Sequence, residues 1–477
     1  MNGGDYVMRP PVLMSLDDVA RAVGGMVYGS RVGISGVTID SRAVATGDLF
    51  VAIVGERYDG HSYVEDAMRK GAVAALTARR VEAQLPIPQV VDGDTRIALG
   101  KLAADWRSRF ALPLVALTGS NGKTTVKEMV ASILAEYVEG TPGAVLATQG
   151  NFNNDIGMPL TLLALRPTHR YAVIELGMNH VGEIEYLSRL AAPTIALVNN
   201  AQRAHIGMLG SVEAVARAKG EIYSGLGLGG IAIVNADDPF AGYWKGLNAG
   251  RRVVSFGLGT SDSARPDVQV SAEGAQARFV TPADAFVATL QVAGEHNLRN
   301  AAAACAVAHA LEIPPHAIQE GLSRFKGVPG RLQRRAGRKG AVLIDDTYNA
   351  NPESMKAALA VLSLESGRRI FVMGDMGELG ETAAELHAEV GRFARELKID
   401  EFLALGPQSM NAVEAFGPQA RHFAGREALL EALEARLRSG TVILVKGSRF
   451  MQMEHVADAL AAREAGFPEP KEGSDAA

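Results

Sequence analysis

The sequence predicts an α/β protein of three domains: a small N-terminal α/β module, a central P-loop domain on a parallel sheet, and a C-terminal Rossmann-like α/β domain. The chain has 477 residues, which is too long for one hydrophobic core, and domains of roughly 100–200 residues imply about three. Short apolar runs alternate with helical segments in two long stretches, as in parallel sheets covered by helices. The segment Gly327–Gly330 separates the two stretches and is typical of a linker.

The N-terminal domain is expected to span residues 1–92. Ser15, followed three residues later by Asp18, has the pattern of a helix N-terminus closed by a capping box. Three short apolar runs separated by Gly, Asp and Arg clusters then indicate strands at Val37–Ile39, Leu49–Ile53 and Ala72–Leu76. A connecting helix is expected from Asp94 to Arg107.

The central domain is expected to span residues 93–330. Five apolar runs predict the strands of its parallel sheet, at Pro113–Leu117, Tyr171–Ile174, Thr194–Val198, Gly230–Val234 and Arg252–Phe256. Closely spaced runs around Val268–Val292 indicate a hairpin-rich insertion. The alanine-rich segment Asn297–Leu311 then predicts a helix.

The last domain is expected to span residues 331–466 and to be another open α/β sheet. Four runs predict its strands, at Ala341–Ile344, Arg369–Met373, Phe402–Leu405 and Thr441–Val445. Pro, Glu, Lys, Gly, Ser and Asp dominate residues 467–477, which predicts a disordered tail.

Composition narrows the class of protein. A hydrophobic content of 47% and a charged content of 21% are those of a globular protein, and a net charge of −5 gives no support for a nucleic-acid partner. The single cysteine, Cys305, is expected to be a buried structural thiol and fits a reducing cytoplasm. No basic start followed by an apolar core and no long apolar stretch occurs, so neither a signal peptide nor a membrane span is predicted.

The strongest motif is Thr118-Gly119-Ser120-Asn121-Gly122-Lys123-Thr124-Thr125, between a predicted strand and a predicted helix. Glycines let backbone amides approach phosphate oxygens, and the helix N-terminus adds positive potential. Lys123 would reach the β and γ phosphates, and Thr124 would hold Mg²⁺. The strict pattern has a glycine where this chain has Leu117, so this is a shorter variant. The alternative is a strand–helix turn with an incidental lysine.

Polar residues follow the predicted strands at Ser120, Glu175, Asn199 and Asn235. Ligands bind at this end of open parallel sheets. Glu175 could ligate Mg²⁺, which prefers oxygen ligands, or it could form an ordinary salt bridge. Pattern reasoning alone makes His205 a loop histidine and Lys219 a solvated helix lysine.

Other polar groups have equally open interpretations. Asn297 and Asn300 could simply cap a helix. Asp345, Asp346 and Asp375 follow strands of the last domain, where each could contact a ribose, a metal or an amine, or cap the next helix.

Together, several motifs give the chain a resemblance to the muramyl ligase family, and within it to the branch that adds D-alanyl-D-alanine. They are Asp40–Arg42 with Gly47–Ala52, the TGSNGKTT loop, Asn151–Gly157, Asp345–Pro352, Gly374–Gly380 and Lys446–Arg449. The Asp-Asn-Pro-Arg motif of the sister ligases that add a single amino acid is absent from the sequence.

The resemblance implies roles for individual residues. Ser41 and Arg42 would bind the UDP part of a nucleotide-linked substrate. His205 would join Glu175 as a magnesium ligand, and Lys219 would carry a carbamate and help to hold magnesium. Further contacts implied for ATP are Asn297, Asn300, Arg331 and Asp346, and those implied for the other substrates are Asn153, Asn154, Tyr348, Asn349 and Lys446.

The resemblance also implies a reaction: ATP-dependent joining of D-alanyl-D-alanine to UDP-N-acetylmuramoyl-tripeptide, with Mg²⁺, by a monomeric cytoplasmic enzyme. Lys123, Lys219 and His205 would be its catalytic residues. Two other classes stay open at this point: a different ATP-dependent ligase such as a folylpolyglutamate synthetase, and a non-catalytic nucleotide-binding scaffold.

Overall fold

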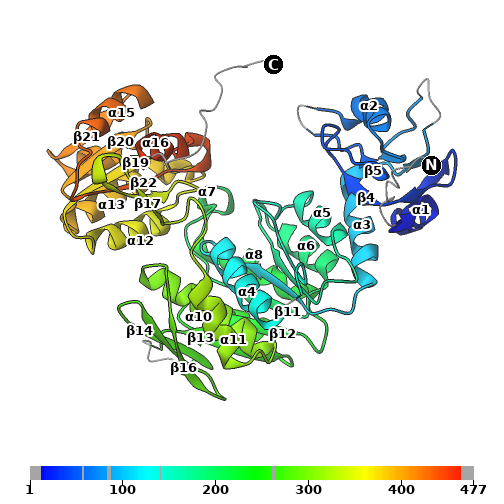
Figure 1. Ribbon diagram of the computed structural model, residues 1–477, viewed down its shortest axis with the longest axis horizontal. Helices are drawn as coiled ribbons and strands as arrows, with labels where there is room; N and C mark the ends of the chain where they lie inside the picture. The colour runs from blue at the N-terminus through cyan, green and yellow to red at the C-terminus, as the bar shows by residue number, and fades with distance from the viewer. Residues whose placement is uncertain (1–11, 56–57, 83–86, 140, 260–264, 463–477) are drawn as a thin grey trace, which may run out of the picture. The chain divides into compact units, whose positions relative to one another are not determined.

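The computed structural model describes residues 12–55, 58–82, 87–139, 141–259 and 265–462 (Figure 1). The predicted tail at 467–477 lies outside the described residues. Contacts group the chain into two compact units, one comprising Met1–Ala201, Ala216–Thr289 and Arg299–Arg324, the other Gln202–Val215, Leu290–Leu298 and Phe325–Ala477. The boundaries at residues 92, 330 and 466 stay a prediction.

The N-terminal part of the first unit is a five-stranded sheet in the order β2-β7-β6-β5-β4. Its strands are β2 (Met26–Tyr28), β4 (Gly36–Thr38), β5 (Asp48–Val51), β6 (Ala74–Thr77) and β7 (Gln89–Val91). Strands β4 to β7 pair in parallel, and β2 is antiparallel to β7. Ser15 caps helix α1 (Leu16–Val23) in the capping box that the sequence predicts. Beside the sheet lie a small pair, β1 (Met14–Ser15) with β3 (Gly33–Ile34), and helices η1 (Gly60–Tyr63) and α2 (Val64–Arg69).

The first unit also contains a nine-stranded sheet in the order β16-β15-β14-β13-β12-β11-β8-β10-β9. Its parallel strands are β8 (Leu114–Thr118), β9 (Val145–Ala147), β10 (Tyr171–Glu175), β11 (Ile195–Val198), β12 (Ile231–Asn235), β13 (Arg252–Gly257) and β14 (Val268–Glu273). The predicted hairpin-rich insertion is confirmed, because β14, β15 (Gln276–Val280) and β16 (Ala285–Thr289) pair antiparallel. The strand order reverses at β8, which lies between β10 and β11, and ligands of open parallel sheets bind beside the carboxyl ends of strands at such a reversal.

Helices accompany this sheet, and those from α4 to α9 other than α7 lie in the connections between its strands. They are α3 (Thr95–Ser108), α4 (Lys123–Tyr137), α5 (Gly157–Leu163), α6 (Glu183–Ala191), α8 (Val212–Gly220), η2 (Glu221–Gly225), α9 (Ala241–Leu247), α10 (Glu295–Ala310) and α11 (Pro315–Arg324). Cys305 on α10 is fully buried, as predicted, and burial raises the pKa of its thiol to about 12. Among the residues that the structure describes, none of the helices has the length and apolar character needed to cross a bilayer.

The second unit contains a six-stranded sheet in the order β17-β18-β22-β19-β20-β21. Its strands are β17 (Gln333–Ala336), β18 (Val342–Asp346), β19 (Arg368–Gly374), β20 (Glu401–Leu405), β21 (Ala420–Phe423) and β22 (Thr441–Lys446), all parallel except β17. The helical elements of this unit are α7 (Ile206–Leu209), η3 (Arg338–Gly340), α12 (Pro352–Ser363), η4 (Gly380–Thr382), α13 (Ala383–Glu396), α14 (Met410–Phe416), α15 (Arg426–Glu434), η5 (Arg449–Met451) and α16 (Glu454–Leu460).

Alternation along the strands gives this sheet two apolar faces. Phe371 and Phe402 belong to one core cluster, with residues of α12, α13 and α14, whereas the neighbouring Ile370 and Leu403 belong to another, with residues of α15 and α16. Successive side chains of a strand point to opposite faces, so continuous apolar runs such as these are buried on both sides.

Candidate active site

The phosphate loop follows the carboxyl end of β8, where the strand order reverses. Gly122 has φ +78° and forms the N-cap of α4, which begins at Lys123. The backbone amides of Thr124 and Thr125 therefore lie in the first turn of a fifteen-residue helix. Such a turn binds anions, because its amides and the helix dipole both favour negative charge.

Asparagine residues outside the loop hold it through backbone and side-chain hydrogen bonds. The backbone N–H of Ser120 donates to the Asn200 carbonyl at 3.0 Å, and that of Asn121 donates to Asn200 Oδ1 at 2.9 Å. Asn199 Nδ2 donates both to the Asn121 carbonyl at 2.9 Å and to Asn300 Oδ1 at 3.0 Å. The carboxyl end of β11 and helix α10 thus fix the loop, and the backbone N–H groups of Ser120 and Asn121 both donate to Asn200.

The predicted lysine and magnesium residues of the first unit come together on this loop. Lys123 Nζ donates to the Gly119 carbonyl at 2.8 Å. Thr124 Oγ1 donates to Glu175 Oε2 at 2.9 Å, and Asn153 Nδ2 donates to Glu175 Oε1 at 2.8 Å. Glu175 is only 2% exposed, so its charge is focused on these few partners. A hydroxyl and a carboxylate side by side are the oxygen donors that Mg²⁺ prefers.

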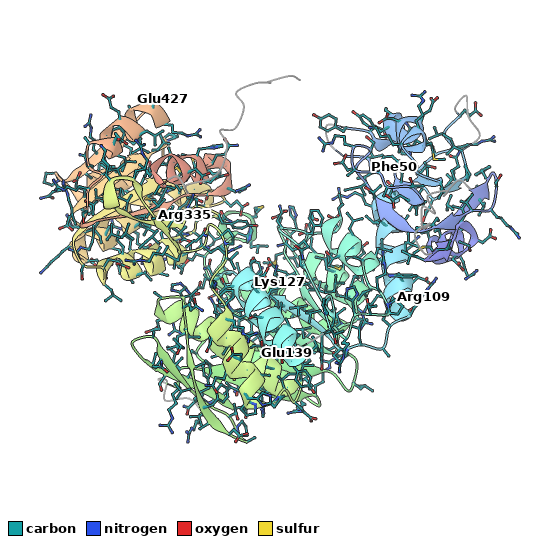
Figure 2. All side chains as sticks on the ribbon, viewed as in Figure 1. Phe50, Arg109, Lys127, Glu139, Arg335 and Glu427 are labelled. Carbon is teal, nitrogen blue, oxygen red and sulfur yellow. The ribbon has the colours of Figure 1, made fainter. Side chains whose placement is uncertain are left out.

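Two supporting residues near Glu175 were not predicted. Thr148 Oγ1 accepts the backbone N–H of Glu175 at 2.9 Å, and the Thr148 carbonyl accepts from Nζ of Lys127. Lys127, labelled in Figure 2, is 1% exposed although it follows Lys123 by one helical turn. Lys127 could not be predicted as buried, because lysines in helices are usually exposed. Thr148 was missed because it follows the three-residue strand β9, which the sequence pattern did not indicate.

Lys219 is the residue whose surroundings differ most from the pattern-based interpretation. Its side chain is completely buried, and Nζ has no hydrogen-bond partner in the part of the chain that the structure describes. Burial lowers the pKa of this amine well below its ordinary value, and Lys123 lowers it further, while Glu175 acts in the opposite direction. The interpretation as a solvated helix lysine is therefore wrong.

His205 belongs to the second unit, whereas Glu175 and Thr124 belong to the first. Its backbone is left-handed, with φ +61°, and its Nδ1 lies 2.7 Å from Oε2 of Glu378. No group of three His, Cys, Asp or Glu side chains suited to a metal ion occurs among the described residues. The pairing of His205 with Glu175 stays a prediction.

Asn297 and Asn300 lie one turn apart on α10 and are both buried. Asn297 Nδ2 donates to the Ala293 carbonyl at 2.8 Å, and Asn300 accepts from Asn199 as described.

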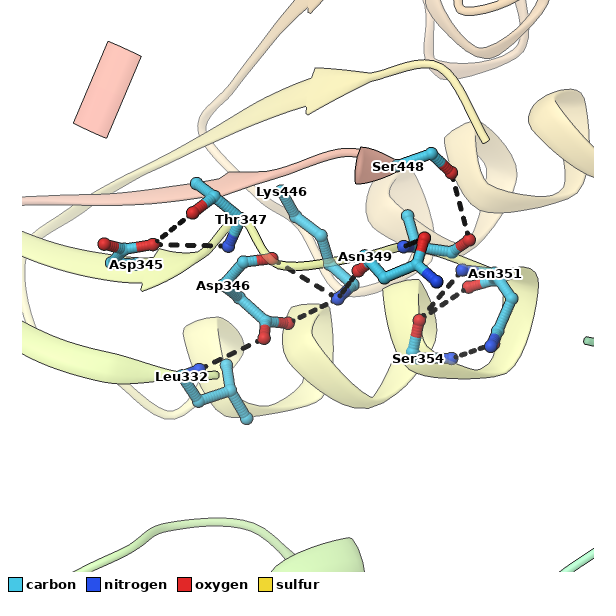
Figure 3. A network of polar contacts seen from close by, with 10 residues as sticks. Leu332, Asp345, Asp346, Thr347, Asn349, Asn351, Ser354, Lys446 and Ser448 are labelled. Carbon is cyan, nitrogen blue, oxygen red and sulfur yellow. Dashed lines mark hydrogen bonds and ion pairs between the residues drawn. The ribbon is translucent and has the colours of Figure 1, made fainter. Parts of the chain in front are cut away.

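A polar network in the second unit joins the ends of β18 and β22 (Figure 3). Lys446 Nζ lies 2.7 Å from Asp346 Oδ2 and donates to the Asn349 carbonyl at 2.8 Å. Asp346 Oδ1 accepts the backbone N–H of Leu332 at 3.1 Å, and burial raises the pKa of this carboxyl while Lys446 opposes the rise. Lys446, predicted as a substrate contact, is 3% exposed, and its ammonium group contacts Asp346 and Asn349 in this network.

An aromatic ring with two guanidinium groups lies beside this network. The Arg331 guanidinium carbon is 4.1 Å from the centroid of the Tyr348 ring, and that of Arg449 is 5.9 Å from it. Both distances are within the reach of cation–π attraction. The Asp375 carboxylate accepts the backbone N–H groups of Gln408 and Ser409, just before α14, and does not cap the next helix along the chain.

Three of the residues predicted to bind the nucleotide-linked and peptide substrates form hydrogen bonds with neighbouring protein groups. Arg42 makes two side-chain hydrogen bonds to Asp40, at 2.9 Å each, and Arg42 holds the pKa of that carboxyl at about 2. The carbonyl of Ser41 accepts from Lys70 Nζ at 3.1 Å. Asn154 Oδ1 accepts the backbone N–H of Gly157 at 2.9 Å, at the start of α5.

Known proteins resemble the chain over nearly its whole length. Family profiles described as Mur ligase family, catalytic domain, as Mur ligase middle domain, and as Mur ligase, glutamate ligase domain match residues 33–107, 117–308 and 330–449. The UDP-N-acetylmuramoyl-tripeptide–D-alanyl-D-alanine ligase of Escherichia coli is 42% identical, over 94% of this chain and 98% of that protein. The Bacillus subtilis protein of the same name is 37% identical, over 90% and 93%.

Solved structures agree with this. The crystal structure of MurF from Acinetobacter baumannii matches with a TM-score of 0.85 and 37% identity, over 93% of this chain and 98% of that one. MurF ligase from Thermotoga maritima in complex with ADP matches with a TM-score of 0.77 and 28% identity, over 89% and 96%. The predicted three-domain α/β fold class is thereby confirmed. From its profile matches, its relatives and its fold, the chain belongs to the Mur ligase family.

Proposed function

We propose that the protein joins D-alanyl-D-alanine to UDP-N-acetylmuramoyl-tripeptide, releasing ADP and phosphate and giving the pentapeptide precursor of peptidoglycan. Relatives named for this reaction align with more than nine-tenths of the chain. The observation that carries the proposal is the phosphate loop at the reversal point of the sheet, where Thr124 is hydrogen-bonded to the buried Glu175.

The chemistry requires an activated carboxylate. A free carboxylate repels the attacking amine, so the γ-phosphoryl group of ATP is first transferred to it, and the dipeptide amine then displaces phosphate from the acyl phosphate. Lys123 and the first turn of α4 offset the repulsion between the two anions during transfer. Bound Mg²⁺ would neutralise further phosphate charge. We assign its ligands as Thr124, Glu175 and His205.

The surroundings of Lys219 support the proposal that this residue carries a carbamate. A buried amine that has no hydrogen-bond partner among the described residues is costly when charged, and burial lowers its pKa, which favours the neutral form. An unprotonated amine nitrogen can bond to the carbon of CO₂ and release one proton, which leaves a carbamate anion. Carbon-13 NMR after incubation with labelled bicarbonate should show a carbamate signal that Lys219→Ala lacks. Short carboxylic acids should restore part of the activity of that variant, and a wild-type rate for the variant would exclude the carbamate.

The remaining predicted contacts stay part of the proposal. Ser41 and Arg42 bind the UDP moiety; Asn297, Asn300, Arg331 and Asp346 bind ATP; Asn153, Asn154, Tyr348, Asn349 and Lys446 bind the peptide substrates. The nucleotide-linked substrate and the single buried thiol of Cys305 favour a cytoplasmic enzyme. We also propose that it acts as a monomer.

The decisive assay combines UDP-N-acetylmuramoyl-tripeptide, D-alanyl-D-alanine, ATP and Mg²⁺, and measures pentapeptide by mass spectrometry together with ADP. Hydroxylamine should trap the acyl phosphate as a hydroxamate when the dipeptide is omitted. Turnover with a single amino acid in place of the dipeptide, or with a folate substrate, would refute the assignment.

Lys123→Ala should lower the rate at least roughly 100-fold, because a contact that stabilises transition-state charge is lost. Lys245, an exposed lysine on α9, provides the matched control, and Lys245→Ala should leave the rate unchanged.

A further inference from the structure

The segment Gln202–Val215, which we call the His205 segment, lies within the stretch that matches the middle-domain profile, yet its contacts place it in the second unit. The residue before it is held by the first unit, because the Ala201 N–H donates to Asp238 Oδ2 at 3.0 Å. The grouping of the chain therefore changes at one peptide bond, between Ala201 and Gln202.

Arg203 provides the polar attachment of the segment. Its Nη1 and Nη2 each donate to one oxygen of Glu389 on α13, both at 2.8 Å, and its Nε donates to Glu353 on α12. Lys356 pairs with the same carboxylate of Glu389. The side chains of Arg203, Glu353 and Glu389 are about three-quarters buried, at 27%, 24% and 25% exposed. Bidentate, partly buried pairs of this kind are stronger and more directional than single surface ion pairs.

Backbone and apolar contacts provide a second attachment, on the other side of His205. The Gly207 N–H donates to the Glu378 carbonyl at 3.0 Å. A Cβ at Gly207 would lie 2.7 Å from that carbonyl oxygen and 2.7 Å from the Gly380 nitrogen, so the two backbones touch where only glycine fits. Ile206 packs against the core cluster that includes Leu379.

His205 lies between these two attachments. It and Glu378, whose Oε2 is 2.7 Å from His205 Nδ1, both have left-handed backbones, at φ +61° and +62°. Such a conformation is unfavourable for residues other than glycine and persists where the surroundings impose it. The contact between His205 Nδ1 and the Glu378 carboxylate is a short ion-pair distance without hydrogen-bond geometry, and Nε2 would be the ring nitrogen that binds a cation, by analogy with carboxylate–histidine pairs at metal sites.

We propose that Arg203 is a positioning residue, which fastens the His205 segment to α12 and α13 and so determines where the His205 imidazole is presented to the divalent cation. This inference rests on the proposed function, because it takes His205 as a magnesium ligand. Arg203 itself touches no substrate or metal in the proposal and acts through the segment.

Hydrogen–deuterium exchange tests the attachment without substrates. In Arg203→Ala the amides of residues 206–210 should exchange about tenfold faster or more, as expected when a charged hydrogen-bonded contact is lost. Arg203→Lys keeps the charge but not the two parallel bonds, and should be intermediate. The matched control is Arg392→Ala, which removes another arginine–glutamate pair of the α13 region, with Glu385, that does not involve the segment.

Titration of MgCl₂ into protein saturated with ADP, followed by calorimetry, tests the consequence for the cation. We expect Mg²⁺ affinity to fall several-fold in Arg203→Ala, to fall less in Arg203→Lys, and to stay unchanged in Arg392→Ala.

Two results would overturn the proposal: unchanged exchange at 206–210, or faster exchange with Mg²⁺ affinity equal to that of the control. Failure of the proposed function looks different. A wild-type protein that binds Mg²⁺ and ADP but forms no pentapeptide would refute the ligase assignment, whereas exchange and affinity would still report on Arg203.

Discussion

Replacing Gly122 by alanine should damage the phosphate loop in a way that can be estimated from the structure. The residue has φ +78°, and a Cβ there would lie 2.3 Å from Asn300 Oδ1 and 2.7 Å from Asn199 Nδ2. Those two atoms are hydrogen-bonded to each other, so the methyl group would force them apart.

Two effects contribute to the expected loss of stability. A left-handed backbone costs a non-glycine residue roughly 1–2 kcal/mol. Breaking the hydrogen bond between Asn199 and Asn300 costs about 1 kcal/mol. Gly122→Ala should therefore destabilise the first unit by about 2–3 kcal/mol, on the sum of these two figures. It should also weaken ADP binding, because the shifted asparagines hold the loop.

Gly143→Ala is the matched control. Gly143 has φ +74°, but a Cβ there would meet no atom of the described residues within 4 Å, so this variant should show the backbone cost alone. Both tryptophans of the chain, Trp106 and Trp244, are buried in the first unit, so urea unfolding followed by tryptophan fluorescence reports on that unit. Equal destabilisation by the two variants would refute the argument from crowding, and unchanged ADP affinity in Gly122→Ala would refute the role of the asparagines.

Two predictions concern pH. Burial lowers the pKa of His387, whose Nε2 accepts the N–H of Met376, so the unfolded chain binds a proton at this residue more readily than the folded protein does. The free energy of unfolding should therefore fall as pH drops below about 6.5, by at most about 1.4 kcal/mol per pH unit. Urea unfolding at several pH values should show a shallower pH dependence for His387→Gln than for wild type. Hydrogen bonds from Arg203 hold the pKa of Glu389 at about 2, so the contribution of Glu389 to stability is present above the ordinary pKa of a glutamate carboxyl and is lost as pH falls toward about 2. Glu389→Gln should lower the free energy of unfolding by roughly 1–2 kcal/mol at pH 7 and by little at pH 2.5. Equal losses at both pH values would contradict this.

The central strands could be predicted because burial on both faces makes them continuous apolar runs. The edge strands β17 and β21 could not, since Gln333–Ala336 and Ala420–Phe423 carry Arg, Gln and His on an exposed edge. Charged side chains are typical of edge strands, which must avoid pairing with other chains. The same protective chemistry removes the hydrophobic signal by which a strand is recognised.

The candidate site divides in a similar way. The residues of the loop from Gly119 to Thr125 are contiguous in sequence, so their spacing alone predicts a phosphate-binding turn. The bond between Asn199 and Asn300 joins residues 101 positions apart, and the accepting role of Thr148 toward Glu175 depends on strand register. Neither has a local signal. The assignment of His205 and Lys219 came from resemblance to a family, because isolated loop histidines and helix lysines are common.

Lys219 shows why such a residue escapes pattern reasoning and still makes chemical sense. As a cation it would lie buried in the field of Lys123, and both burial and that neighbour lower its pKa. Burial and Lys123 thus both disfavour a positive charge on Lys219, which makes it a poor second cation for binding phosphate. As the proposed carbamate, the same side chain would be an anion in the field of Lys123 and an oxygen donor for magnesium, so the repulsion that depresses the amine's pKa would become attraction. Burial disfavours the charged amine and so favours the neutral form, which is the form that the proposed reaction with CO₂ requires.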